Sequence, residues 1–96
     1  MLQSTSTPKP QIMHFSNLEF FSYNLCPGAT RAKYVFENNW EVSVLAGPED
    51  SGLYGDIKRD TFEVAIIRPN GDMLHDVLQY QTPVQVSSLM RLISFL

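Results

Sequence analysis

Two apolar runs, Thr61–Ile67 and Met73–Leu78, flank a short polar segment, Arg68–Asp72. The proline of this segment presets φ for the first corner of a turn, and its glycine accepts a left-handed backbone without a Cβ clash. The pattern therefore predicts a hairpin closed by a three-residue loop, a type I turn followed by a bulge. Such a turn places Arg68 opposite Asp72, where we expect an exposed ion pair of little energetic weight.

A second hairpin is predicted over Ala32–Gly47, with its tip at the two adjacent asparagines. A two-residue loop would mix apolar and charged residues on both faces. A three-residue loop, Glu37–Asn39, instead gathers one continuous apolar face, and a slip by one residue would destroy it. The predicted cross-strand pairs are Phe36 with Trp40, Tyr34 with Val42, and Ala32 with Val44. Asn39 then takes the left-handed position, which asparagine tolerates better than most residues.

The end of the chain carries the clearest helix signal. Thr82 is placed as the N-cap, Pro83 follows at the first helical position, and Gln85 completes a capping box. Apolar residues then recur at helical spacing and form a stripe that suits one face of a sheet. These residues are Val86, Leu89, Met90, Ile93 and Leu96.

The first third of the chain is less regular. Residues 1–11 are polar, with two prolines, and we expect a flexible leader. The aromatic-rich segment Ile12–Leu25 fits either a helix or a strand, and its β-favouring composition points to a strand or an extended arm. The Pro-Gly pair in Cys26–Gly28 predicts a turn.

Together these elements predict an α+β fold: an antiparallel sheet of two hairpins, about four strands, packed against a C-terminal helix. Residues 12–96 would form this single domain. Both faces of the Thr61–Leu78 hairpin are partly apolar. One face would pack on the helix, and the other needs a cover from the N-terminal arm or a partner chain.

The composition of the chain argues against several classes of function. The 96 residues are 44% hydrophobic with a net charge of −3, enough to fill a core but without a basic run for general nucleic-acid binding. The single cysteine, Cys26, fits a reducing cytosol, and no apolar run is long enough to span a membrane. A direct nucleic-acid role would require four cations to converge. They are Arg31, Lys33, Lys58 and Arg59.

Candidate catalytic groups are few. His14 and His75 have no evident partners, since a neighbouring Asp76 on a strand faces the other way. Cys26 precedes Pro-Gly in a turn and is interpreted as a structural thiol. No calcium-loop spacing and no phosphate-binding glycine loop is present. We therefore expect a non-enzyme without a metal or cofactor.

The long segment Gly47–Asp60 holds the best binding candidates. Its three glycines and one proline predict a surface loop between the hairpins. An exposed tyrosine near an arginine is typical of protein interfaces. The candidate partner-binding residues are Leu53, Tyr54, Lys58 and Arg59. In the alternative interpretation, Leu53 and Tyr54 fold back to cover the second face of the sheet.

Three features of the middle of the chain form a pattern: the segment Tyr34–Val44, the glycines after it, and Phe62–Ile66 with its Glu-Val-Ala strand. This pattern resembles that of small uncharacterised proteins of tailed bacteriophages. In that group an aromatic-x-Phe-x-Asn-Gly turn leads to a Ser-Val strand, a Gly-rich loop, a further strand and a terminal helix. The chain departs from the pattern at Asn39, where the group usually has glycine. The resemblance runs from Tyr34 to the C-terminus and implies a phage setting, with no chemistry.

From these observations we expect a small phage-encoded protein in the host cytoplasm that binds and inhibits a host protein. A defence factor or a nucleic-acid-processing factor would be a suitable target. The alternative is a structural, self-assembling protein, a homodimer at its simplest, in which the second sheet face pairs with its copy. Membrane binding is not expected.

Overall fold

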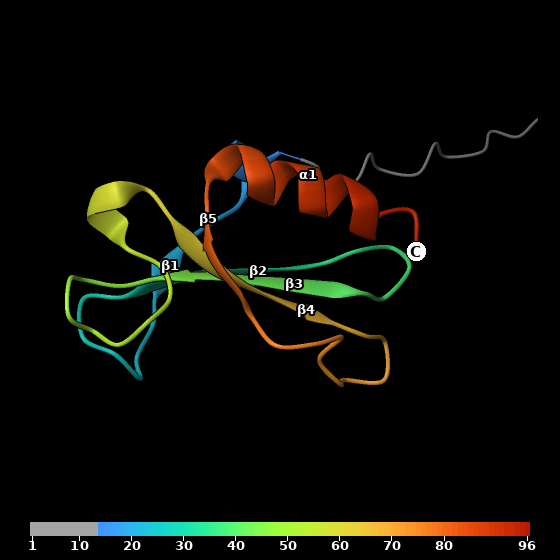
Figure 1. Cartoon of the computed structure of the whole chain (residues 1–96). Coiled ribbons are helices and arrows are strands. Elements are labelled where there is room, and N and C mark those ends of the chain that lie inside the picture. The colour runs from blue at the N-terminus through green and yellow to red at the C-terminus, as the bar shows by residue number, and fades with distance from the viewer. Residues whose placement is uncertain (1–13) are drawn as a thin grey trace, which may run out of the picture.

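The computed structural model describes residues 14–96, so the leader expected over residues 1–11 lies outside them. The strands are β1 (Phe21–Ser22), β2 (Thr30–Val35), β3 (Glu41–Ala46), β4 (Phe62–Ile67) and β5 (Leu78–Gln81). The helices are the 3-10 helices η1 (Phe15–Asn17) and η2 (Ile57–Arg59) and the α-helix α1 (Pro83–Ile93). The strands form one antiparallel sheet in chain order, and α1 lies over one face of it (Figure 1). The α+β class is confirmed, with five strands rather than about four.

The β2–β3 hairpin has the predicted register. Ala32 pairs with Val44 and Tyr34 with Val42. Phe36 N–H donates to the Trp40 carbonyl at 2.7 Å, and Asn39 takes the left-handed position with φ 69°. The three-residue loop, predicted because it keeps the apolar side chains on one face of the hairpin, is therefore confirmed.

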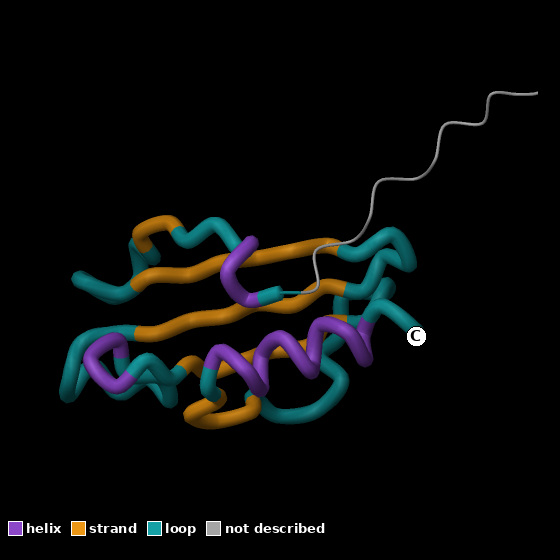
Figure 2. The backbone as a smooth tube through the Cα atoms, turned by 90° about the horizontal axis from the view of Figure 1, so that it is seen from above, coloured by secondary structure: helices purple, strands orange, loops and turns teal. Residues whose placement is uncertain are grey.

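The core lies between this sheet and a layer formed by α1 and η1, which lie side by side above the strands (Figure 2). Alternate residues of the three central strands point into it. The buried core residues are Phe36, Val42, Val44, Ala46, Phe62, Val64, Ile66, Val86, Met90 and Ile93. At about 25 cal/mol per Å² of buried apolar surface, this cluster is the main source of the fold's stability.

The segment Ile12–Leu25 is predicted to be a strand or an extended arm, and its described part is an arm that contains the short helix η1 and the two-residue strand β1. The Phe15 and Phe20 rings lie 4.8 and 5.6 Å from the Phe62 ring, and Phe15 N–H donates to Ser87 Oγ on α1 at 2.8 Å. The arm thus completes the layer on the α1 side and does not cover the second face of the sheet.

The turn after β4 is also confirmed. Arg68 N–H donates to the Asp72 carbonyl at 2.8 Å, Gly71 N–H donates back to the Arg68 carbonyl, and Gly71 has φ 95°. The expected ion pair is absent among the described residues. The Asp72 carboxylate accepts a hydrogen bond from Asn70 Nδ2 at 3.3 Å instead.

The predicted strand Met73–Leu78 is wrong. Only Met73 bridges β4, opposite Ile67, and the ladder resumes at Leu78 opposite Val64. His75 lies in the intervening bend, where its Nδ1 is 2.8 Å from the Asp76 carbonyl oxygen. Leu74 packs against the core and its N–H donates to the Ile66 carbonyl at 2.8 Å, but the chain bends over residues 74–76, so the strand proper, β5, begins later.

The C-terminal helix is built as predicted. Thr82 Oγ1 accepts from Gln85 N–H at 3.2 Å, and the Gln85 side chain accepts from Thr82 N–H at 2.8 Å. At its other end, Asn38 Nδ2 at the β2–β3 tip donates to the carbonyls of Ile93 and Leu96, at 2.9 and 3.1 Å. The first bond reaches the last residue of α1, and the second reaches the segment that follows the helix. The helix is therefore held at both ends.

Replacing Thr82 by alanine removes the capping oxygen. We expect Thr82→Ala to lower the free energy of unfolding by about 1 kcal/mol, the usual value of an N-cap. Urea denaturation followed by circular dichroism measures this loss. Thr82→Ser keeps the oxygen and should retain most of the stability; equal losses in both variants would contradict the capping role.

Candidate functional site

The 47–60 loop is fastened to the end of the sheet by its backbone. Gly47 N–H donates to the Gly55 carbonyl, and Ile57 N–H donates to the Gly47 carbonyl, both at 3.1 Å. A Cβ on Gly55 would lie 2.5 Å from the Leu45 carbonyl oxygen, so the loop crosses β3 and β4 where only glycine fits. The predicted surface loop is thus ordered, and it contains η2.

Charged groups organise η2. The Asp56 carboxylate accepts Lys58 N–H at 2.9 Å and forms an ion pair with the Arg59 guanidinium, which also lies 3.8 Å from Glu49. Desolvation alone would raise the pKa of Asp56. The hydrogen bonds from Arg59 and from the Lys58 backbone, with the Arg59 charge, outweigh it and lower this pKa below its ordinary value.

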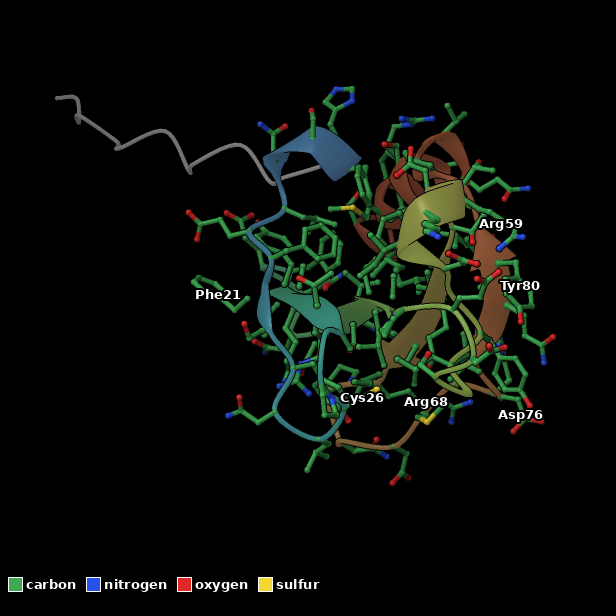
Figure 3. The ribbon with its side chains drawn as sticks, turned by 90° about the vertical axis from the view of Figure 1, so that its left-hand side faces the viewer. Phe21, Cys26, Arg59, Arg68, Asp76 and Tyr80 are labelled. Atoms are coloured by element: carbon green, nitrogen blue, oxygen red, sulfur yellow. The ribbon has the colours of Figure 1, made fainter. Side chains whose placement is uncertain are left out.

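An aromatic pair forms the most distinctive part of this end of the molecule. The rings of Tyr54 and Tyr80 meet edge to face, with centroids 6.2 Å apart, and Tyr80 N–H donates to the Tyr54 carbonyl at 2.8 Å. Tyr54 is 45% exposed and Tyr80 51% exposed. Both line a pocket of about 360 Å³ whose rim includes Glu49 and Asp50. Figure 3 shows Tyr80 and Arg59 at the same edge, opposite Phe21.

Tyr80 has an unusual backbone. Its φ is 53°, in the left-handed region that large side chains rarely adopt. It lies in a bulge, because Phe62 pairs with Gln81 and Val64 with Leu78, so that β5 has one residue more than β4 between these two pairs. A bulge re-aims a side chain, and here it brings the Tyr80 ring against Tyr54. A strained backbone of this kind costs about 1–3 kcal/mol and concentrates at functional sites.

The four predicted partner-binding residues have different fates. Tyr54 and Arg59 are exposed at the same end of the sheet, and Lys58 is exposed on η2. Leu53 instead folds back, with its Cδ1 only 2.7 Å from where a Cβ on Gly47 would lie. Leu53 is thus half-buried against the loop's own Gly47, whereas Tyr54 stays exposed and does not fold back onto the sheet. Sequence reasoning missed Tyr80, since no glycine or asparagine marks its left-handed backbone.

The four cations proposed for a nucleic-acid role do not form one patch. Lys33 pairs with Glu41 at 3.2 Å, and the Arg31 guanidinium lies 4.8 Å from the centre of the Tyr23 ring. Both project from β2 on the face away from α1, because their neighbour Ala32 is buried beneath the helical layer. Lys58 and Arg59 are on η2, on the α1 side of the strands (Figure 1).

The candidate catalytic residues are likewise dispersed. His75 is in the bend before β5, Cys26 is in the turn after β1, and His14 precedes η1. Within residues 14–96, no three metal-binding side chains are close enough to hold an ion. The same part of the chain has no helix of the length and apolarity that a bilayer crossing needs.

Comparisons of the chain with models of known families, with curated proteins and with solved structures find no match. Inference about function therefore rests on the geometry of the Tyr54–Tyr80 pair and its ordered loop.

Gly55→Ala tests the close crossing of the loop over the sheet. We expect a loss of about 1–3 kcal/mol in unfolding free energy, because the new methyl meets backbone atoms that cannot move aside. Urea denaturation measures it. Gly52→Ala is the matched control: its φ of 85° adds strain, but no atom lies within 4 Å. A smaller loss at Gly55 than at Gly52 would contradict the crossing.

The lowered pKa of Asp56 gives a pH dependence. The carboxylate is charged above its ordinary pKa of 3.8, and the contact with Arg59 is lost as the pH falls through the lowered value. An NMR titration of the Asp56 carboxyl and the Lys58 amide should therefore show a transition below that pH. Arg59→Gln should move the transition upward; an unmoved transition would contradict the ion pair.

Proposed function

We propose that the protein is a small, non-catalytic, phage-encoded protein that binds a bacterial host protein in the host cytoplasm and inhibits it. The observation that carries the proposal is the exposed Tyr54–Tyr80 pair, held in a strained conformation at the end of an ordered loop. The phage setting comes from the resemblance of residues 34–96 to small phage proteins.

Paired tyrosines suit a contact surface. A tyrosine supplies a large, amphipathic contact area and loses little conformational entropy on binding, since it has only two side-chain torsions. Tyr54 and Tyr80 fix each other's rings, and the backbone bond between them fixes their spacing. Much of the ordering cost of binding is therefore met before the partner arrives.

Arg59 extends this surface with a charge. Its side chain is 65% exposed while its guanidinium is held by Asp56 and Glu49. Arginine and tyrosine are the residue types enriched where binding energy concentrates. A protein with such a surface inhibits by occupying a site on its partner, and a defence factor or a nucleic-acid-processing factor remains our suggested target.

A self-assembling structural protein is the second candidate. The sheet face away from α1 exposes Val35 (57%) and Met73 (46%), which favours a contact between copies. The same face carries the Lys33–Glu41 ion pair, whose burial in a face-to-face contact would cost desolvation energy. The tyrosine pair is therefore the stronger basis for function.

A site-specific crosslink tests the proposal in bacterial cells. A photo-reactive phenylalanine at Glu49, on the rim of the tyrosine pocket, should give one dominant crosslinked host protein. The same group at Val84, which is 76% exposed on α1, is the control. Equal crosslinking from both positions, or none from position 49, would count against the proposal.

Tyr80→Asn separates binding from folding. Asparagine tolerates a positive φ, so the variant should be as stable as the original chain or more stable. Loss of the ring should weaken partner binding by about 1–2 kcal/mol, roughly five- to thirtyfold in Kd. Calorimetry with the captured partner measures this change. Val84→Asn should bind normally; unchanged binding by Tyr80→Asn would remove the tyrosine pair from the interface.

A further inference from the structure

The outer edge of β2 is open for most of its length. β1 pairs only with Thr30 and Arg31, so within the described chain no strand covers the outer side of Lys33 and Val35. Phe36 N–H donates to the Trp40 carbonyl, so the backbone of Phe36 faces the β3 side of the hairpin. Because backbone groups alternate along a strand, the N–H and C=O of Lys33 and Val35 point outward.

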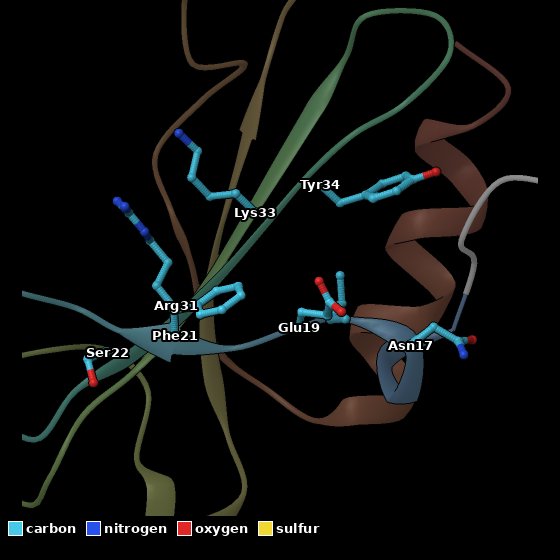
Figure 4. A pocket seen from close by; sticks show the side chains of 8 residues that line it. Asn17, Glu19, Phe21, Ser22, Arg31, Lys33 and Tyr34 are labelled. Atoms are coloured by element: carbon cyan, nitrogen blue, oxygen red, sulfur yellow. The ribbon is translucent and has the colours of Figure 1, made fainter.

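A pocket lies along this same edge. It has a volume of about 430 Å³ and is lined by Leu18, Phe21, Lys33 and Tyr34 among others (Figure 4). Phe21 is 70% exposed beside it. The arm from η1 to β1 forms the far wall, so the pocket is room left where β1 diverges from β2.

We propose that a second copy of the chain occupies this edge, with the two β2 strands antiparallel about a two-fold axis. A two-fold contact uses the same surface on both copies, and an open strand is self-complementary in its hydrogen bonds. The sheets then join into one, with α1 of both copies on the same side.

Charge and steric limits select the register. Centring the axis on Lys33 would oppose two like charges and would drive the second strand into β1 at Arg31. Centring it on Tyr34 would place Glu37 of the second copy, the residue that directly continues its strand, opposite Arg31, where Phe21 already pairs. Centring it on Val35 avoids both conflicts.

The Val35-centred register also has favourable contacts. The two Val35 residues exchange both outward hydrogen bonds, and their exposed side chains meet. Lys33 of each copy comes opposite Glu37 of the other, a complementary charge. The tip of the second hairpin, residues 37–39, enters the pocket beside Phe21. That tip is rigid, because Asn38 binds the carbonyls of Ile93 and Leu96.

Sedimentation equilibrium of the full chain over a wide concentration range tests the dimer. We expect a monomer–dimer equilibrium that Val35→Pro weakens at least tenfold, about 1.4 kcal/mol. Proline removes the outward N–H, which makes no bond within the monomer, and edge strands tolerate it there. Val35→Ala keeps the N–H and should dimerise more strongly than Val35→Pro. Circular dichroism checks that each variant is folded.

A charge variant keeps the test decisive if Val35→Pro does not fold. Glu37→Lys opposes Lys33 of the other copy and should weaken the dimer, whereas Asp76→Lys, the same change in the distant bend before β5, should not. A strict monomer overturns the proposal, as does a dimer insensitive to both Val35→Pro and Glu37→Lys. Protection of the Val35 amide only on adding another protein would also overturn it, in favour of a foreign strand.

This outcome is independent of the proposed function. Tyr80→Asn changes partner binding at the β5 edge, and Val35→Pro changes self-association at the β2 edge. Crosslinking from position 49 without a dimer would contradict only the proposal for the β2 edge. A dimer without that crosslinking would contradict only the proposed function of the tyrosine pair.

Discussion

The register of the β2–β3 hairpin is the constraint on which the rest of the structure depends. Pairing Ala32 with Val44 and Tyr34 with Val42 puts Phe36, Val42, Val44 and Ala46 on one face, and α1 and the N-terminal arm pack onto that face. A shift by one residue would turn the face to solvent and remove the surface that α1 needs. The same hairpin places Asn38 at the helix end. Strand pairing, helix position and the end of the chain are thus one coupled arrangement.

Much of this arrangement could be predicted because it rests on local signals of strong physical origin. Apolar alternation fixes the three-residue loop, the capping box of Thr82 fixes the start of α1, and Gly71 closes the turn after β4. The arm and β5 could not be predicted in the same way. The place of Phe15 depends on a surface that exists only once α1 has docked, and β5 starts late because of an interruption rather than a pattern.

The residues of the candidate site also differ in whether the sequence could predict them. Tyr54 could be proposed from composition, since an aromatic residue between glycines in a loop has little reason to be buried. Tyr80 could not, because its importance comes from a bulge that turns it toward Tyr54, and its flanking glutamines do not mark a left-handed residue. Leu53 lies in the same short stretch as Tyr54, but it folds back. Gly47 has no side chain, and the Leu53 side chain occupies the space that a Cβ there would need. Adjacent residues of one loop thus take opposite roles for steric reasons.

The two edges of the sheet are covered in different ways, and each therefore suits a different kind of contact. At β5, the bulge and the loop cover the edge with side chains, so the partner recognition proposed there would depend on rings and charges. At β2, the early departure of β1 leaves backbone groups uncovered, so the self-association proposed there would depend on hydrogen-bond register. A dimer joined through β2 places its two tyrosine pairs at the far ends of one continuous sheet. The proposed dimer would bind a partner that carries two copies of the target site more tightly than one copy of the chain would, because the second contact becomes intramolecular.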